Sequence, residues 1–192
     1  MRNFKKPHRQ GGFIGIAILG VALAFGAAAI ALKFMNQVRN EQRMNNDSYP
    51  LRVVAGALAQ YAKANKSSLV SNKEIMYVND QYAPSLNELV NLGFLSTSGI
   101  NAVSAYGTGL TTKIVYPSPD GSVTGYVFTT SSLKDAKGNP DSKRACAIAN
   151  EIGDAGLCSS IANPASIGNN ATQFVVNPAQ PARVGALIFV PK

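Results

Sequence analysis

The stretch "FIGIAILGVALAFGAAAIAL", residues 13–32, contains no polar side chain and lies close to the start of the chain. A helix of this length rises about 1.5 Å per residue and spans about 30 Å, the thickness of the hydrocarbon core of a bilayer. We therefore expect residues 13–32 to form a helix that is able to cross a membrane.

Four basic residues, and no acidic residue, precede this stretch. A secretory signal also begins in this way, and the small residues Ala27, Ala29 and Ala31 could form its cleavage site, but its apolar part is usually about 7 to 15 residues long. A permanent transmembrane anchor fits the length and leaves the glycine pair Gly11-Gly12 without a role. Both interpretations stay open beside a third one.

The third interpretation is a family resemblance. A short basic leader that ends in Gly12, followed by Phe13 at the start of an apolar segment, resembles the class III signal of type IV pilins and type II secretion pseudopilins. The resemblance implies that a prepilin peptidase cleaves between Gly12 and Phe13. It also implies that the new amine of Phe13 is methylated, and that loss of the basic leader frees the apolar helix to leave the membrane.

Small residues recur along one face of the expected helix. Gly20, Ala24 and Ala28 follow one another at four-residue spacing. Small residues allow close helix packing in lipid, although they are common in any membrane helix. Most members of the resembled family carry a glutamate at the position of Ala17, where it pairs with a neighbouring amine. An unpaired buried amine is costly, so Ala17 favours a minor subunit over one that repeats along a filament.

The net charge of +8 arises from 18 basic and 10 acidic residues. Part of it lies in the leader, and beyond the leader the basic residues are scattered, with Lys143 and Arg144 as the one adjacent pair. A nucleic-acid-binding surface would show clustered basic residues interleaved with aromatic ones. We therefore expect no nucleic acid as a primary partner.

The chain has one histidine, His8, which lies in the leader. Without another histidine there is no Ser-His or Cys-His pair and no HExxH zinc motif, so we expect no enzyme, no catalytic residue and no cofactor. The oxygen-rich segment "DAKGNPD", residues 135–141, lacks the later glutamate of a calcium loop and is expected to be a solvated loop.

The two cysteines, Cys146 and Cys158, are separated by twelve positions. In a head outside the cytoplasm they would form a disulfide, which contributes about 3 kcal/mol by constraining the unfolded chain. Two buried free thiols are the alternative. A zinc site is unsupported, because two cysteines alone do not complete the coordination of zinc.

Periodicity and turn residues predict the elements of the remaining chain. A polar continuation of the helix should kink or break near Pro50, where Asp47 or Ser48 could cap a new turn. The pattern from there to residue 62 predicts an amphipathic helix. A capping box at Ser85 and Glu88 predicts a short helix. Further predictions are a hairpin of residues 110–116 and 123–130, a helix over residues 142–152 capped by Asp141 or Ser142, and strands over residues 173–176 and 184–190.

These elements and the resemblance predict an α+β pilin fold, in which a long N-terminal helix with a protruding apolar half packs on a small antiparallel sheet with short helices. We expect a cleaved leader over residues 1–12, an apolar filament-core helix with a polar extension over residues 13–46, and a globular periplasmic or extracellular head over residues 47–192. The middle of the chain is also similar to the constant domain of type IVb minor pilins associated with shufflon recombination.

The resemblance implies a structural subunit of a type IV pilus, either a minor or a type IVb pilin. Its partners would be other pilin subunits, the prepilin peptidase, the inner-membrane assembly machinery, and membrane lipid before assembly. It would cross the bacterial inner membrane once and then enter an extracellular pilus that serves adhesion or conjugation. A pseudopilin of a type II secretion system and a membrane-anchored periplasmic binding or adaptor protein are the alternatives.

Overall fold

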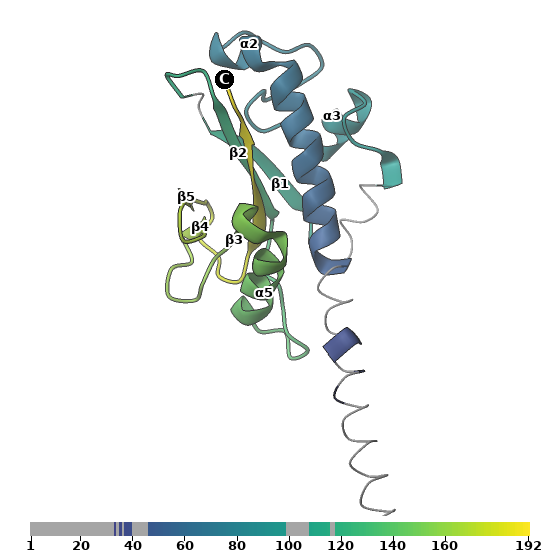
Figure 1. Cartoon of the computed structure of the whole chain (residues 1–192), viewed down its shortest axis with the longest axis vertical. Helices are drawn as coiled ribbons and strands as arrows, with labels where there is room; N and C mark the ends of the chain where they lie inside the picture. Colours follow the sequence, from purple (N-terminus) through teal and green to yellow (C-terminus); the bar gives the residue numbers. More distant parts are fainter. Residues whose placement is uncertain (1–32, 34, 36, 40–45, 99–107, 116–117) are drawn as a thin grey trace, which may run out of the picture. The chain divides into compact units, whose positions relative to one another are not determined.

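The computed structural model describes residues 33, 35, 37–39, 46–98, 108–115 and 118–192 (Figure 1). The chain divides into two units, Met1–Arg43 and Met44–Lys192, and the sheet belongs to the second. In the first unit, the described residues are helical. No helix in the described part of the chain has both the length and the hydropathy needed to span a bilayer.

A helix occupies residues 46–64. The amphipathic pattern predicted for it is confirmed, since the six apolar residues of that pattern are all buried: Leu51, Val54, Ala55, Leu58, Tyr61 and Ala62. Of the predicted kink or break near Pro50, the break is wrong, because residues 46–64 are helical without interruption. Burial of the apolar face outweighs the single backbone hydrogen bond that a proline removes.

Two short helices follow, α2 (Lys66–Val70) and α3 (Leu86–Asn91). The predicted capping box of α3 is confirmed: the Ser85 hydroxyl accepts the Glu88 N–H (3.2 Å) and the Glu88 carboxylate accepts the Ser85 N–H (2.6 Å). The same carboxylate accepts the Asn79 N–H at 2.7 Å. These bonds favour the ionised form and lower the pKa of Glu88, the bond from Asn79 most of all.

Six strands form one antiparallel sheet in the order β1-β2-β6-β3-β4-β5. The predicted hairpin is confirmed as β1 (Leu110–Val115) and β2 (Val123–Thr129), and the two later strands as β5 (Gln173–Val175) and β6 (Val184–Val190). The three-residue strands β3 (Gly156–Cys158) and β4 (Ser166–Gly168) were not predicted. The predicted helix after residue 141 is confirmed as α5 (Ser142–Ile152), followed by the short 3-10 helix η2 (Gly153–Ala155).

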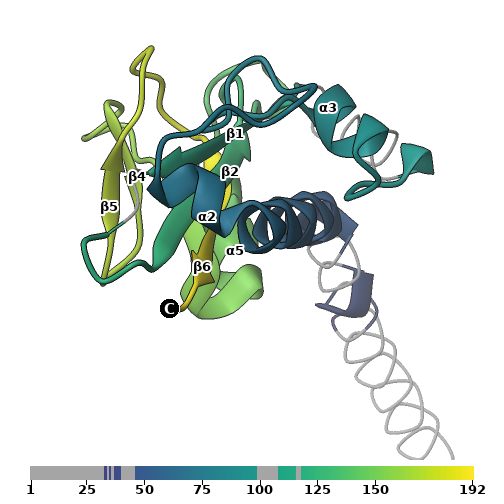
Figure 2. The ribbon, with the colours of Figure 1, turned by 90° about the horizontal axis from the view of Figure 1, so that it is seen from above.

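The sheet buries apolar side chains on both faces. On the first face, β1, β2 and β6 form one core with the helix over residues 46–64 and with α5 (Figure 2). On the second face, a smaller cluster lies beneath β4 and β5; its buried members are Tyr126, Phe128, Leu157, Ile167 and Val176. The two strands in the middle of the sheet, β2 and β6, therefore contribute to cores on both of its sides.

This arrangement corrects the predicted fold class. The described residues combine helices with an antiparallel sheet, but they include no long apolar N-terminal helix, and the sheet has six strands where a small sheet was expected. The prediction of a pilin fold is therefore wrong. It failed on the sheet because β2 is buried at every position from 125 to 129, so both faces need a cover, and β3, β4 and β5 supply the second.

Candidate functional site

Most residues that the sequence singles out for a function lie outside the described part of the chain. These are Gly12 and Phe13 at the predicted cleavage site, Ala17, and the helix-packing residues Gly20, Ala24 and Ala28. The structure does describe Cys146 and Cys158, and the candidate site is built around them.

Helix α5 carries Cys146 and is held by a cap at its start and by packing along its inner face. At its start, Oδ1 of Asp141 accepts the N–H of Arg144 at 3.0 Å, which confirms the predicted cap. Along its inner face, Ala145, Ile148 and Ala149 are buried in the first core. Cys146 forms a disulfide with Cys158 of β3, with Cα atoms 5.1 Å apart, so the predicted pairing of the two cysteines is confirmed.

The strand β3 passes directly against the backbone of α5. A Cβ atom added to Gly156 would lie 1.8 Å from the carbonyl oxygen of Ala149, closer than any real contact. Because that oxygen belongs to the helix backbone, it cannot turn aside as a flexible side chain would. The absence of a side chain at Gly156 is what allows α5 and β3 to approach closely beside the disulfide.

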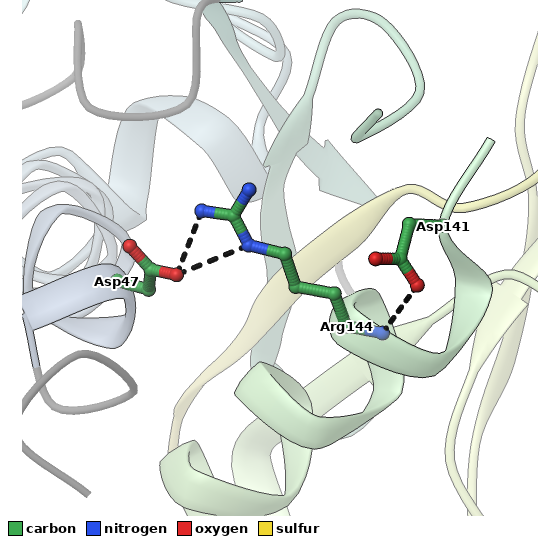
Figure 3. A network of polar contacts seen from close by, with 3 residues as sticks. All are labelled: Asp47, Asp141 and Arg144. Carbon is green, nitrogen blue, oxygen red and sulfur yellow. Dashed lines mark hydrogen bonds and ion pairs between the residues drawn. The ribbon is translucent and has the colours of Figure 1, made fainter. Parts of the chain in front are cut away.

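Arg144 joins α5 to the helix over residues 46–64. Its Nε and Nη2 atoms donate to one carboxylate oxygen of Asp47, at 3.2 and 2.8 Å, as Figure 3 shows. The Arg144 and Asp47 side chains are 40% and 21% exposed. A pair this accessible to solvent contributes about 1 kcal/mol or less to the free energy of unfolding. Its main effect is therefore to orient the helix over residues 46–64 relative to α5.

A second contact joins the same two helices near the other end of α5, where the Arg52 guanidinium donates to the carbonyl of Glu151. We call the set formed by Asp47, Arg52, Arg144, Cys146 and Cys158 the α5 clamp. It connects the first described turns of the helix to α5 by polar contacts, and α5 to β3 by a covalent bond. Sequence reasoning found the two cysteines and missed the arginines, because Arg144 and Asp47 are 97 positions apart.

A cavity of about 690 Å³ lies beside the C-terminal end of α5. Part of its wall is formed by β4 and the residues on either side of it, namely Asn163, Ser166, Gly168, Asn169 and Asn170. Its described lining consists mainly of amides, hydroxyls and small residues, with Asp154 as the one carboxylate. Such groups can form hydrogen bonds with a polar ligand, but the lining offers no nucleophile with an adjacent base.

Arg183 is the largest fully buried side chain and lies at the end of the second core. Its Nη2 donates to the Thr130 carbonyl at 3.0 Å, and its guanidinium carbon lies 5.4 Å from the centre of the Phe128 ring. Burial lowers the pKa of Arg183. In the described part of the chain, Nε and Nη1 have no hydrogen-bond partner. No feature of the sequence marked this arginine as buried.

Taken together, the residues of the α5 clamp form a cross-linked support for the helix over residues 46–64. Within residues 135–141, Asp135 accepts the backbone N–H groups of Lys137 and Asn139 and so closes a tight turn. Comparison with protein-family models, with curated proteins and with solved structures finds no match for the chain.

Proposed function

We propose that the chain is a minor structural subunit of a type IV pilus, cleaved after Gly12 by a prepilin peptidase and assembled through its apolar segment, residues 13–32. One observation carries the proposal: four basic residues, then Gly12, then Phe13 at the head of twenty residues without a polar side chain. A secretory signal has a shorter apolar part, and a permanent anchor has no use for the glycine pair.

The physical role of the leader follows from its charge. Basic groups hold their end of an apolar segment on the cytoplasmic side of the membrane. Cleavage after Gly12 removes these groups and keeps residues 13–32, which can then pack through Gly20, Ala24 and Ala28 against equivalent segments. Ala17 supplies no carboxylate for the neighbouring amine, which supports a minor position and not a repeated one.

The head supports the proposal through its disulfide. Disulfides persist in oxidising compartments such as the bacterial periplasm and the cell surface, and are rare in the cytosol. The Cys146–Cys158 bond is therefore consistent with a head that lies outside the cytoplasm. The bond joins two positions of the head and involves no residue of the apolar segment.

Mass spectrometry of the mature N-terminus, after co-expression with a prepilin peptidase, tests this proposal. A chain that begins at methylated Phe13 supports it. A chain that retains Met1 would indicate a permanent anchor, and a chain that begins at Ile30 or Leu32 would indicate ordinary secretion; either result overturns the proposal. The Gly12→Val variant should stay uncleaved, whereas the matched Gly11→Val variant should still be processed.

A further inference from the structure

The last part of β6 has an open edge. β6 extends from Val184 to Val190 and pairs along this whole length with β2. On its other side, β3 pairs only as far as Ala186, opposite Gly156. Figure 1 shows β6 running on past the short β3 toward the C-terminus. In the part of the chain that the structure describes, no strand lies beside residues 187–190 on this side.

The register identifies the backbone groups on the open side. Successive residues of a strand point their backbone N–H and C=O groups to opposite sides. Thr130 donates its N–H to the carbonyl of Gly109 at 2.8 Å, so the even-numbered residues of β2 bond to β1 and the odd-numbered residues bond to β6. Opposite those odd-numbered residues lie the even-numbered residues of β6. Leu187 and Phe189 therefore point their N–H and C=O groups away from β2. The pairing of Gly156 with Ala186 directs the Leu187 N–H to the carbonyl of Ala155, so among the described residues Phe189 is the position of β6 that the register leaves open. The bond from the Ser159 N–H to the Arg183 carbonyl, at 2.9 Å, follows the same alternation.

A groove of about 440 Å³ lies at this open edge. One wall is formed by Ala59, Gln60 and Lys63 of the helix and by Lys66 of α2, and the other by residues 189–192 at the end of β6. Phe189 is 61% exposed and presents an apolar ring there. An extended segment about four residues long, or about 13 Å, would match residues 187–190 of the edge.

The charges around the groove select its occupant. Lys63, Lys66 and Lys192 line it, and no acidic side chain does so among the described residues. Lys66 Nζ donates to the Pro191 carbonyl at 2.7 Å. Asp120 lies near the far end, where its pKa is lowered mainly by the backbone N–H and hydroxyl of Ser122 and further by Lys192. Pairing of two β6 edges from two copies would bring like charges together, which is unfavourable.

We infer that the open edge of β6 binds an extended segment of another protein that carries carboxylate side chains, and that this segment adds a strand to the sheet. Its backbone would pair with Phe189, its apolar side chains would contact the Phe189 ring, and its carboxylates would face Lys63 and Lys66. Strand addition is a general mode of peptide recognition at exposed sheet edges. The inference rests on the head alone and holds whether or not the chain is cleaved after Gly12.

The test uses the full chain in lipid nanodiscs and a labelled synthetic hexapeptide of alternating glutamate and valine, followed by fluorescence anisotropy. We expect saturable binding, at least tenfold slower hydrogen exchange of the Phe189 amide, and little change at the Val190 amide, which already faces β2. The same peptide with N-methylated valines keeps its charge and loses backbone pairing, so it should bind at least tenfold more weakly.

Charge is tested with the double variant Lys63→Glu/Lys66→Glu, matched by Lys134→Glu/Lys137→Glu at the distant turn. The first should weaken binding at least tenfold and favour a lysine-valine peptide, while the second should bind like the wild type. Thermal melts confirm that both are folded. No binding of the acidic peptide, equal binding of the N-methylated peptide, or unchanged exchange at Phe189 would each overturn the inference.

Discussion

The two faces of the sheet are covered in different ways. On the first face, aliphatic side chains of β1, β2 and β6 pack against the helix over residues 46–64 and against α5, and the α5 clamp ties these helices together and to the sheet. On the second face, the Tyr126 and Phe174 rings stack with centroids 4.4 Å apart beneath strands of three residues, and Arg183 closes one end.

This difference separates two ways of excluding water from a sheet. The helical cover brings a long apolar face, a capped helix and a covalent bond, so its contributions are large and cooperative. The cover formed by β4 and β5 is short, and it shields an arginine whose Nε and Nη1 lack partners in the described chain. We therefore expect the first face to dominate the stability of the head, and four measurements test this expectation.

The largest effect is expected at Gly156, where the first face is most tightly assembled. In Gly156→Ala, the new methyl group would meet the Ala149 carbonyl, and α5 would have to move away from β3. We expect a loss of more than about 3 kcal/mol in the free energy of unfolding, measured by urea denaturation.

Gly56→Ala is the matched control for this change. Gly56 is exposed on the helix and has nothing within 4 Å of an added Cβ, so alanine should stabilise the head by up to about 1 kcal/mol. If the two variants changed stability by the same amount, close approach at β3 would not be the cause.

The next effect is expected from the disulfide. Replacing both Cys146 and Cys158 by serine should lower the free energy of unfolding by about 3 kcal/mol, because the unfolded chain regains its freedom. Hydrogen exchange should show α5 losing protection while the hairpin of β1 and β2 keeps it. Equal loss of protection across the whole sheet would contradict a role confined to the clamped side.

A smaller effect is expected from Glu88 beside the first core. Since its pKa is lowered in the folded chain, its stabilisation is present above its ordinary pKa of 4.5 and is lost as the pH falls through the folded value. Glu88→Gln should cost about 1 kcal/mol at pH 7, and the difference from the wild type should vanish in acid.

Glu74→Gln serves as the reference for Glu88, because Glu74 is an exposed glutamate of the head. Thermal unfolding of the three proteins between pH 3 and pH 7 measures the comparison. A Glu88→Gln deficit that stayed constant over this range would show that the carboxylate charge is not involved.

The smallest effect is expected on the second face. In Arg183→Met, a side chain of similar length replaces a desolvated cation, so the gain in burial offsets the lost contacts with Thr130 and Phe128. We expect a change within about 1 kcal/mol, measured by urea denaturation, with Arg144→Met as the exposed counterpart. A loss above about 3 kcal/mol would mean that the guanidinium is fully paired in solution.

The helices and the hairpin were predictable because their signals are local. The capping box of Ser85 and Glu88, the cap at Asp141, and the three- and four-residue spacing of Leu51, Val54 and Leu58 each act within a few residues. Local signals also misled at Pro50, since the helix is held together by distant packing that no local pattern reports.

The second core could not be predicted in the same way. β3 and β4 have three residues each, too few for an alternating pattern, and their partners lie far along the chain. From the sequence, Arg183 would be expected on the surface, as most arginines are, although it is buried. The Asp47–Arg144 ion pair joins residues far apart in the chain, so no local spacing of residues predicts it. The α5 clamp was therefore half predicted, through its cysteines, while the processing residues Gly12 and Phe13 remain predictions.

The α5 clamp also determines how the head would respond to a mechanical load. A tensile load that enters the helix near residue 46 reaches α5 through Asp47 and Arg52 within the first described turns. From α5 it crosses to β3 through a sulfur–sulfur bond and then spreads into the neighbouring β6 ladder. Of these steps, the non-covalent one from the helix to α5 should yield first, because a solvent-accessible ion pair contributes about 1 kcal/mol or less, whereas the step from α5 to β3 is covalent.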